Sequence, residues 1–275
     1  MKFQLIEGRM HKSPYTFLKS AVWVHLFLSA LILFLFKFQV LQLSNRHLLI
    51  FVNSNMLITS AFAILCVALV LRRTDLDAAG MEFWKILVAS LGLLFATESA
   101  GAIEELAGFA DGSGFQVSFY IGLLARLALI YLAMRVIVSS EISTWTGWSQ
   151  ALLPWLFIIS FGIFVLYFVV VPMYNEHNII EEIMGPIFMV FAGLVVLIFL
   201  TTALAGRRMG DPDKTLAYFW PLAGLVVYIV TDVMYYCHLT MNISAFVLWE
   251  LGFFAGYLFS AYGALLMLED NRAKL

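Results

Sequence analysis

The chain has 275 residues, of which 63% are hydrophobic and only 12% are charged, and its formal net charge is −2. A soluble domain needs more polar surface than this, so most of the chain is expected to lie in lipid. The small negative charge excludes an electrostatic nucleic-acid binder, and the two cysteines form neither a metal-ligand spacing nor a disulfide framework.

Apolar stretches of about 20 residues recur along the chain, which is the length a helix needs to cross the hydrocarbon core of a bilayer. The first stretch, 17–36, is too long for a signal-peptide core and is expected to be retained. The stretches predict an all-α, polytopic integral membrane protein of about eight transmembrane helices, forming one domain over 1–275 with no soluble domain. The expected spans are 18–42, 48–71, 84–108, 115–138, 150–172, 184–206, 216–238 and 244–268.

The basic residues predict the orientation of these spans. Of the 16 Lys and Arg residues, 13 fall in segments on the same side as the N-terminus, while only Lys37 and Arg46 fall on the other side. Positively charged loops stay in the cytoplasm. Both termini are therefore expected to be cytoplasmic, in a multi-pass protein of the cell membrane.

One acid and one base are expected near mid-membrane in neighbouring spans. Glu98 and Arg126 each lie about 11 residues from the turn at 109–114, which places them at similar depth. A charge in hydrocarbon costs several kcal/mol unless it is paired or hydrated, so the two side chains are expected to pair. Such a pair is equally typical of a functional site and of a structural contact that holds two helices in register.

A second group of polar residues is expected in the outer half of the last two spans. Asp232 and Glu250 have no basic residue nearby, and Tyr228 and Tyr257 lie on the same helix faces as these two acids. Two close carboxylates repel unless one is protonated, or a cation or hydrogen-bonding ligand lies between them. The two acids therefore indicate a binding site.

Small and amide side chains extend this pattern. Gly252, Gly256 and Ser260 form a ridge at i+4 spacing that predicts close helix packing. Thr97-Glu98 and Thr231-Asp232 lie at comparable depth in spans of the same direction, which suggests a tandem four-plus-four arrangement. A polar core is expected between the second, third, fourth, seventh and eighth spans, open to the outside. Its expected ligand-binding residues are Glu98, Arg126, Asp232, Glu250, Asn53, Asn55, Tyr228 and Tyr257.

No cofactor, metal site or catalytic residue is predicted. His25 lies in the inner part of the first span, while His47 and His238 lie at outer ends, so no histidine pair faces across the membrane as bis-histidine haem ligation requires. The last two spans contain no lysine for a retinal Schiff base. Phosphate-binding, zinc-protease and nucleophile-elbow motifs are absent from the sequence.

The stretches 224–232 (GLVVYIVTD) and 248–257 (LWELGFFAGY) resemble the last helices of multi-pass sensor regions in prokaryotic signalling proteins. This resemblance implies a stand-alone receptor-like module or a partner protein, because the chain carries no kinase or cyclase domain. The same stretches are also similar, more faintly, to the eight-span lysoplasmalogenase family. That resemblance places the first acidic position at Glu98, but the histidine that the family has in the next helix is absent here.

The leading hypothesis is a membrane-embedded sensing or binding module that takes a small ligand, lipid headgroup or cation from the outer side. Its expected partners are the lipid bilayer and other membrane proteins or further copies of itself. A transporter or channel subunit is the first alternative, although the six prolines fall outside the spans or near their ends, whereas carriers usually have broken helices at mid-membrane. A lipid-modifying enzyme using Asp232 and Glu250 as acid and base is the second alternative, and enzyme activity stays open.

Overall fold

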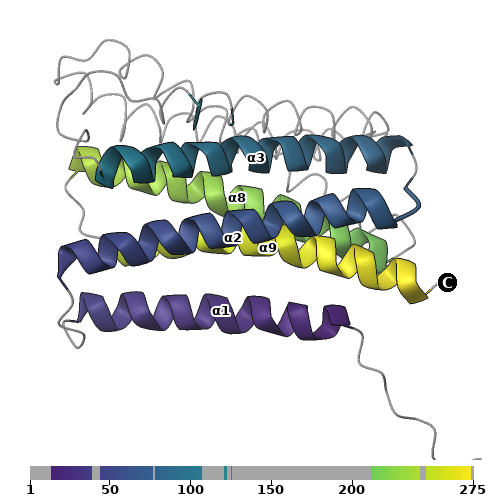
Figure 1. The fold of residues 1–275 in the computed structure, drawn as a ribbon, viewed down its shortest axis with the longest axis horizontal. Helices are drawn as coiled ribbons and strands as arrows, with labels where there is room; N and C mark the ends of the chain where they lie inside the picture. The colour runs from purple at the N-terminus through teal and green to yellow at the C-terminus, as the bar shows by residue number, and fades with distance from the viewer. Residues whose placement is uncertain are drawn as a thin grey trace, which may run out of the picture.

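The computed structural model describes residues 14–38, 44–76, 78–106, 121, 122, 125, 212–241 and 246–273. All regular secondary structure within these ranges is α-helical, and the long helices lie side by side (Figure 1). They are α1 (Pro14–Lys37), α2 (Asn45–Arg73), α3 (Ala78–Leu106), α8 (Pro212–Met241) and α9 (Phe246–Ala273).

Four of these helices are long and apolar enough to cross a membrane. Their spanning segments are Pro14–Lys37, Arg46–Arg73, Gly80–Glu104 and Trp249–Asp270, and α8 contains a shorter apolar segment, Leu216–Thr231. The prediction of a helical membrane protein is confirmed at this level. The expected spans at 115–138, 150–172 and 184–206 lie outside the described residues, apart from positions 121, 122 and 125.

The helix ends differ from the expected ones by a few residues. The helices α1 and α8 begin at Pro14 and Pro212, ahead of the expected starts at 18 and 216, because a proline lacks only an N–H that the first turn leaves unused. Ser44 caps α2 by accepting the backbone N–H of His47 at 3.4 Å. Thr74 ends α2 in an extended conformation, with its backbone N–H donating to Val70 O.

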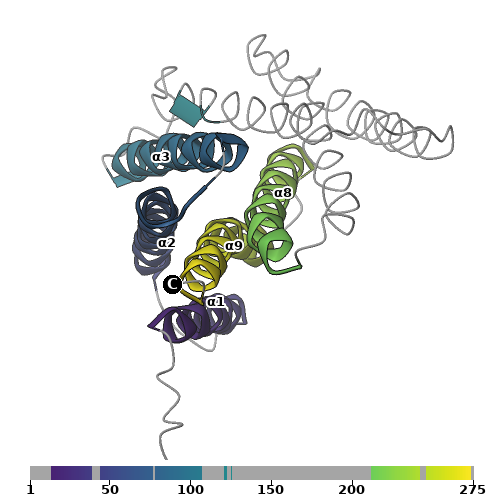
Figure 2. The same ribbon diagram turned by 90° about the vertical axis from the view of Figure 1, so that its right-hand side faces the viewer.

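The helix α9 lies at the centre of the described part. It packs against α8, α2 and α1, and α3 packs on α2 (Figure 2). In its spanning segment 67% of the residues are buried, against 17% in that of α1. The side chains of Phe254 and Tyr257 on α9 are among the largest that are fully buried.

The helices α8 and α9 approach most closely, at the predicted glycine ridge. A Cβ at Gly252 would collide with the Thr231 hydroxyl, and a Cβ at Gly256 would lie 3.0 Å from Gly224 O. Only glycine at these two positions allows the backbones to come this close. The prediction of close packing through this ridge is confirmed.

Pro221 lies inside α8, near the start of the apolar segment Leu216–Thr231. The helix starts at Pro212, so Pro221 sits nine residues into it and leaves Ala217 O without its usual intrahelical donor. Gly263 of α9 packs directly against Ala217 O, because a Cβ at Gly263 would come within 2.6 Å of this oxygen.

The spanning segment of α1 is the least buried of the four, and α1 is attached mainly to α9. Its outward surface is apolar, as lipid contact requires. Trp23 joins it to the bundle by ring contacts with Trp220, Phe259 and Tyr262 at centroid distances of 5.7, 5.7 and 5.6 Å. The exposed large side chains of this surface are Phe17, Val24, Phe27, Leu28, Leu31 and Phe34.

Candidate functional site at Glu98

Glu98 on α3 is the meeting point of three helices. Its Oε1 accepts a hydrogen bond from the Tyr228 hydroxyl of α8 at 3.1 Å and from the Tyr257 hydroxyl of α9 at 3.0 Å. Hydrogen bonds to a charged acceptor are stronger than those between neutral groups. One carboxylate oxygen therefore joins α3 to the α8–α9 pair.

Packing fixes both tyrosines in this arrangement. Tyr257 is 1% exposed and Tyr228 is 6% exposed, and their rings meet edge to face with centroids 5.5 Å apart. Phe253 packs on the other side of Tyr228 with its ring centroid 4.9 Å away. Because the rings cannot turn freely, their hydroxyls are held in position to donate hydrogen bonds to the carboxylate.

The glycine ridge of α9 sets the spacing of the two tyrosines. A Cβ at Gly256 would lie 3.0 Å from the Cβ of Tyr228, so glycine lets the α8 backbone approach directly beside Tyr257. The two phenols, which are far apart in sequence, then point at the same carboxylate. Glu98 itself is half-buried, so the site is not sealed.

A carboxylate that gathers two hydroxyls can bind a cation or a hydrogen-bond donor with little rearrangement of its surroundings. A ligand that draws the Glu98 oxygen toward itself would weaken the bonds from Tyr228 and Tyr257.

The structure distributes the predicted residues over several places. Glu98, Tyr228 and Tyr257 come together, although the spacing argument assigned the tyrosines to Asp232 and Glu250. Glu250 is half-buried near the start of α9. Arg126 and the side chain of Asp232 lie outside the described residues, and so does the expected pairing of Arg126 with Glu98.

Asn55 belongs to a different polar cluster, which joins α1 to α2. Its Oδ1 lies 2.7 Å from His25 Nε2, and its Nδ2 donates to Ser29 Oγ at 2.9 Å. Asn53 is half-buried on another side of α2 and is separated from this cluster by the turn of the helix. The polar core was expected to exclude the first span, whereas Asn55 is directed toward it.

Sequence reasoning did not identify His25 and Ser29 as members of a site. Their i, i+4 spacing places both on one face of α1, and this was the available signal. The histidines were considered only as haem ligands, so a histidine paired with an amide was not considered.

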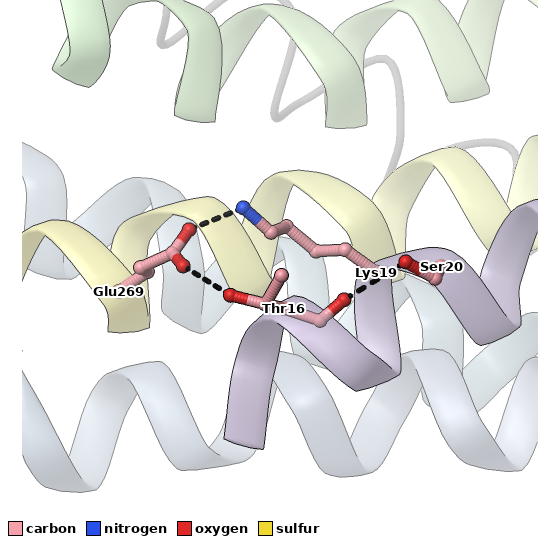
Figure 3. A network of polar contacts seen from close by, with 4 residues as sticks. All are labelled: Thr16, Lys19, Ser20 and Glu269. Atoms are coloured by element: carbon pink, nitrogen blue, oxygen red, sulfur yellow. Dashed lines mark hydrogen bonds and ion pairs between the residues drawn. The ribbon is translucent and has the colours of Figure 1, made fainter. Parts of the chain in front are cut away.

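A third polar group joins the start of α1 to the end of α9. Lys19 forms an ion pair with Glu269, and the Thr16 hydroxyl donates to the other carboxylate oxygen at 2.9 Å (Figure 3). The start of α1 and the end of α9 therefore lie at the same end of the bundle. Both charged side chains are partly exposed, as expected near a membrane surface.

Among the described residues, no three His, Cys, Asp or Glu side chains are grouped closely enough to hold a metal ion. No family model, curated protein or solved structure matches the chain.

Proposed function

We propose that the chain is a membrane-embedded sensing or binding module whose ligand site is centred on Glu98. This proposal rests on the observation that Glu98 Oε1 accepts hydrogen bonds from tyrosine hydroxyls of both α8 and α9. The ligand class is a small cation, or a small molecule or lipid headgroup that presents a positively charged or N–H donor group to the carboxylate. It enters from the outer side, because Glu98 lies in the second half of the outward-running α3.

Ligand binding is read out as a change in helix packing. A cation at Glu98 competes with the two phenols for the same oxygen, which shifts the balance between a state with α3 tied to α8 and α9 and a state with α3 released. A ligand shifts this balance only by its differential affinity for the two states. The central position of α9 carries the change to α1 and α2, which pack on it.

Thermal unfolding of the purified protein in detergent tests this function. Wild-type protein is scanned against monovalent and divalent cations, alkylamines and soluble lipid headgroups, and at least one class should raise the melting temperature in a saturable manner. Glu98→Gln should remove that response. The matched control is Glu104→Gln, which removes a carboxylate from the same helix nearer its outer end and should keep the response.

A purely structural role for Glu98 predicts a different result. In that case no probe stabilises the wild-type protein, and Glu98→Gln melts at a lower temperature under every condition. That outcome rejects the binding function and leaves Glu98 as a packing contact between three helices.

A cation transporter is the second candidate, and the position of Pro221 is the observation that favours it. A proline inside a membrane helix allows the two halves of α8 to move relative to one another, as in carriers with interrupted helices. Tyr228 lies seven residues beyond Pro221 in α8, so bending there would move its hydroxyl relative to Glu98. Cation uptake into proteoliposomes by wild-type protein but not by Glu98→Gln would select transport over sensing.

The finer topology belongs to the same proposal. Eight spans with both termini in the cytoplasm, in the cell membrane, place the Glu98 site in the outer half. The Lys19–Glu269 contact supports the even number of spans, because it brings the start of α1 and the end of α9 to one end of the bundle.

A further inference from the structure

The cluster of His25, Ser29 and Asn55 lies away from the Glu98 site and has a chemistry of its own. Ser29 is 2% exposed and Asn55 is 5% exposed, so the cluster is closed on the side of the bundle. His25 is half-buried and borders the exposed apolar surface of α1, where Leu28, one turn further on, is 48% exposed. His25 therefore lies at the boundary between this closed cluster and the exposed surface of α1.

The hydrogen bonds of Asn55 fix the tautomer of His25. Because Asn55 Nδ2 donates to Ser29, it is the amide oxygen that faces His25 Nε2 at 2.7 Å. An amide oxygen only accepts, so Nε2 carries the proton of the neutral ring. The other nitrogen, Nδ1, is then left with a lone pair, and none of the described residues donates to it.

The depth of His25 restricts what can donate to Nδ1. His25 lies 11 residues after Pro14 and 12 before Lys37, which puts it about 17 Å from either end of α1. The expected span 18–42 places His25 in the inner part of the membrane, whereas the observed segment Pro14–Lys37 puts it at the middle. For a segment centred in the bilayer, this is the hydrocarbon core, where bulk water is absent and from which phospholipid headgroups lie some 15 Å away. A donor must therefore be soluble in hydrocarbon and carry few polar groups.

We propose that the Nδ1 edge of His25 binds an amphiphile from the bilayer that carries a hydroxyl donor on an apolar body, such as a long-chain alcohol. The hydroxyl donates to Nδ1, and the apolar body lies along the exposed face of α1 beside Leu28. Asn55 and Ser29 do not touch this ligand. They are positioning residues that hold the ring in the tautomer that can accept from it.

Protonation of His25 would abolish this site without breaking the cluster. An imidazolium still donates from Nε2 to Asn55, but its Nδ1 becomes a donor and no longer accepts a hydroxyl. Among the described residues, the hydrogen-bond partner of His25 is the neutral Asn55, which in turn donates to the neutral Ser29. The neutral ring is thus the form that binds the alcohol.

Solid-state NMR of the full chain in lipid bilayers, with ¹⁵N-labelled histidine, tests the inference directly. The His25 ring signals are assigned by their loss in His25→Gln, and the other four histidines serve as internal references. Addition of 1-decanol should move the Nδ1 resonance of His25 toward the protonated range in a saturable manner. Methyl decyl ether, which has the same apolar body but no donor, should leave it in place.

Two variants separate the site from general solvation by alcohol. Asn55→Leu removes the acceptor that fixes the tautomer and should raise the decanol concentration at half-shift at least fivefold, while Ser20→Ala, an exposed serine on the same helix, should not change it. No shift with decanol in the wild-type protein, or an equal shift with the ether, would overturn the inference. The absence of any cation or headgroup response at Glu98 in the wild-type protein would leave this measurement at His25 unchanged, so the two proposals fail separately.

Discussion

Glu98 receives the hydroxyls of Tyr228 and Tyr257 on one oxygen, at 3.1 and 3.0 Å, and both phenols are almost wholly buried. A buried hydroxyl that loses its acceptor in lipid has no water to replace it. The contribution of Glu98 to the free energy of unfolding therefore includes the hydrogen bonds that it provides to two donors on other helices. Removing the carboxylate and removing a phenol are not equivalent changes.

A double-mutant cycle measures this contact. Tyr257→Phe should lower the free energy of unfolding by about 1 to 2 kcal/mol, because it deletes one bond to the carboxylate. In a Glu98→Met background the same change should cost close to nothing. Tyr262→Phe, on the same helix, is the control, since its ring contacts with Trp23 and Trp220 survive the loss of the hydroxyl. Equal costs in both backgrounds would show that Tyr257 and Glu98 are not coupled.

At the scale of the helices, the α8–α9 contact depends on glycines, which have no side chain to keep the two backbones apart. Gly252 and Gly256 bring the two backbones together, and Thr231 occupies the space that a Cβ at Gly252 would need. Helices in lipid gain little from burying apolar surface against each other, so shape complementarity at such positions decides whether they associate.

Gly252→Ala should destabilise the protein by about 1 to 3 kcal/mol, because the new methyl group collides with the Thr231 hydroxyl. Adding Thr231→Ala should recover at least half of that loss in an unfolding titration. Gly92→Ala is the matched control, since a Cβ there meets nothing within 4 Å and should stabilise α3 by about 0.5 to 1 kcal/mol. A destabilising Gly92→Ala together with a neutral Gly252→Ala would contradict this packing.

The attachment of α1 near its start, through Lys19, is weaker. The Lys19–Glu269 ion pair is partly exposed, with side-chain exposures of 19% and 32%, so Glu269→Gln should cost about 1 kcal/mol or less. Lys19→Glu should cost more, because two carboxylates then face each other, and Lys19→Glu with Glu269→Lys should restore most of the stability. Unfolding at low and high salt checks the assignment, since the difference between these variants must shrink as salt screens the charges.

At the scale of the whole molecule, the distribution of basic residues predicts that Gly112 and Leu275 lie on opposite sides of the membrane. Reporter fusions that are active only in the cytoplasm should therefore work at Leu275 and fail at Gly112. Activity at both positions would remove the outward direction of α3, on which entry to Glu98 from the outer side depends.

The sequence predicts those features of this molecule that depend on residues close together in the chain, and it does not predict contacts that depend on how distant helices pack. Hydropathy is local, so it locates α1, α2, α3, α8 and α9 to within a few residues. The ridge of Gly252 and Gly256 is also local and predicts the α8–α9 contact. The partners of Tyr228 and Tyr257 are set by how three helices rotate and stack, and i+4 and i+7 spacings within one helix carry no information on that. For this reason the tyrosines were assigned to acids on their own helices, while their bonds reach Glu98 on α3.

The central place of α9 has a consequence for how the protein is made. Thr16 and Lys19 contact Glu269, about 250 positions later in the chain, and α1 and α2 both pack on α9. A ribosome releases α1 and α2 into the membrane long before α9 exists. The helix α1 must therefore remain in lipid without its main partner until α9 is inserted, whereas α2 and α3 can pack on each other earlier. The apolar exterior of α1 is compatible with this exposure to lipid. Assembly of the bundle is thus a late, post-insertion event, and a chain stalled before residue 246 would hold its first helices in the bilayer without their common partner.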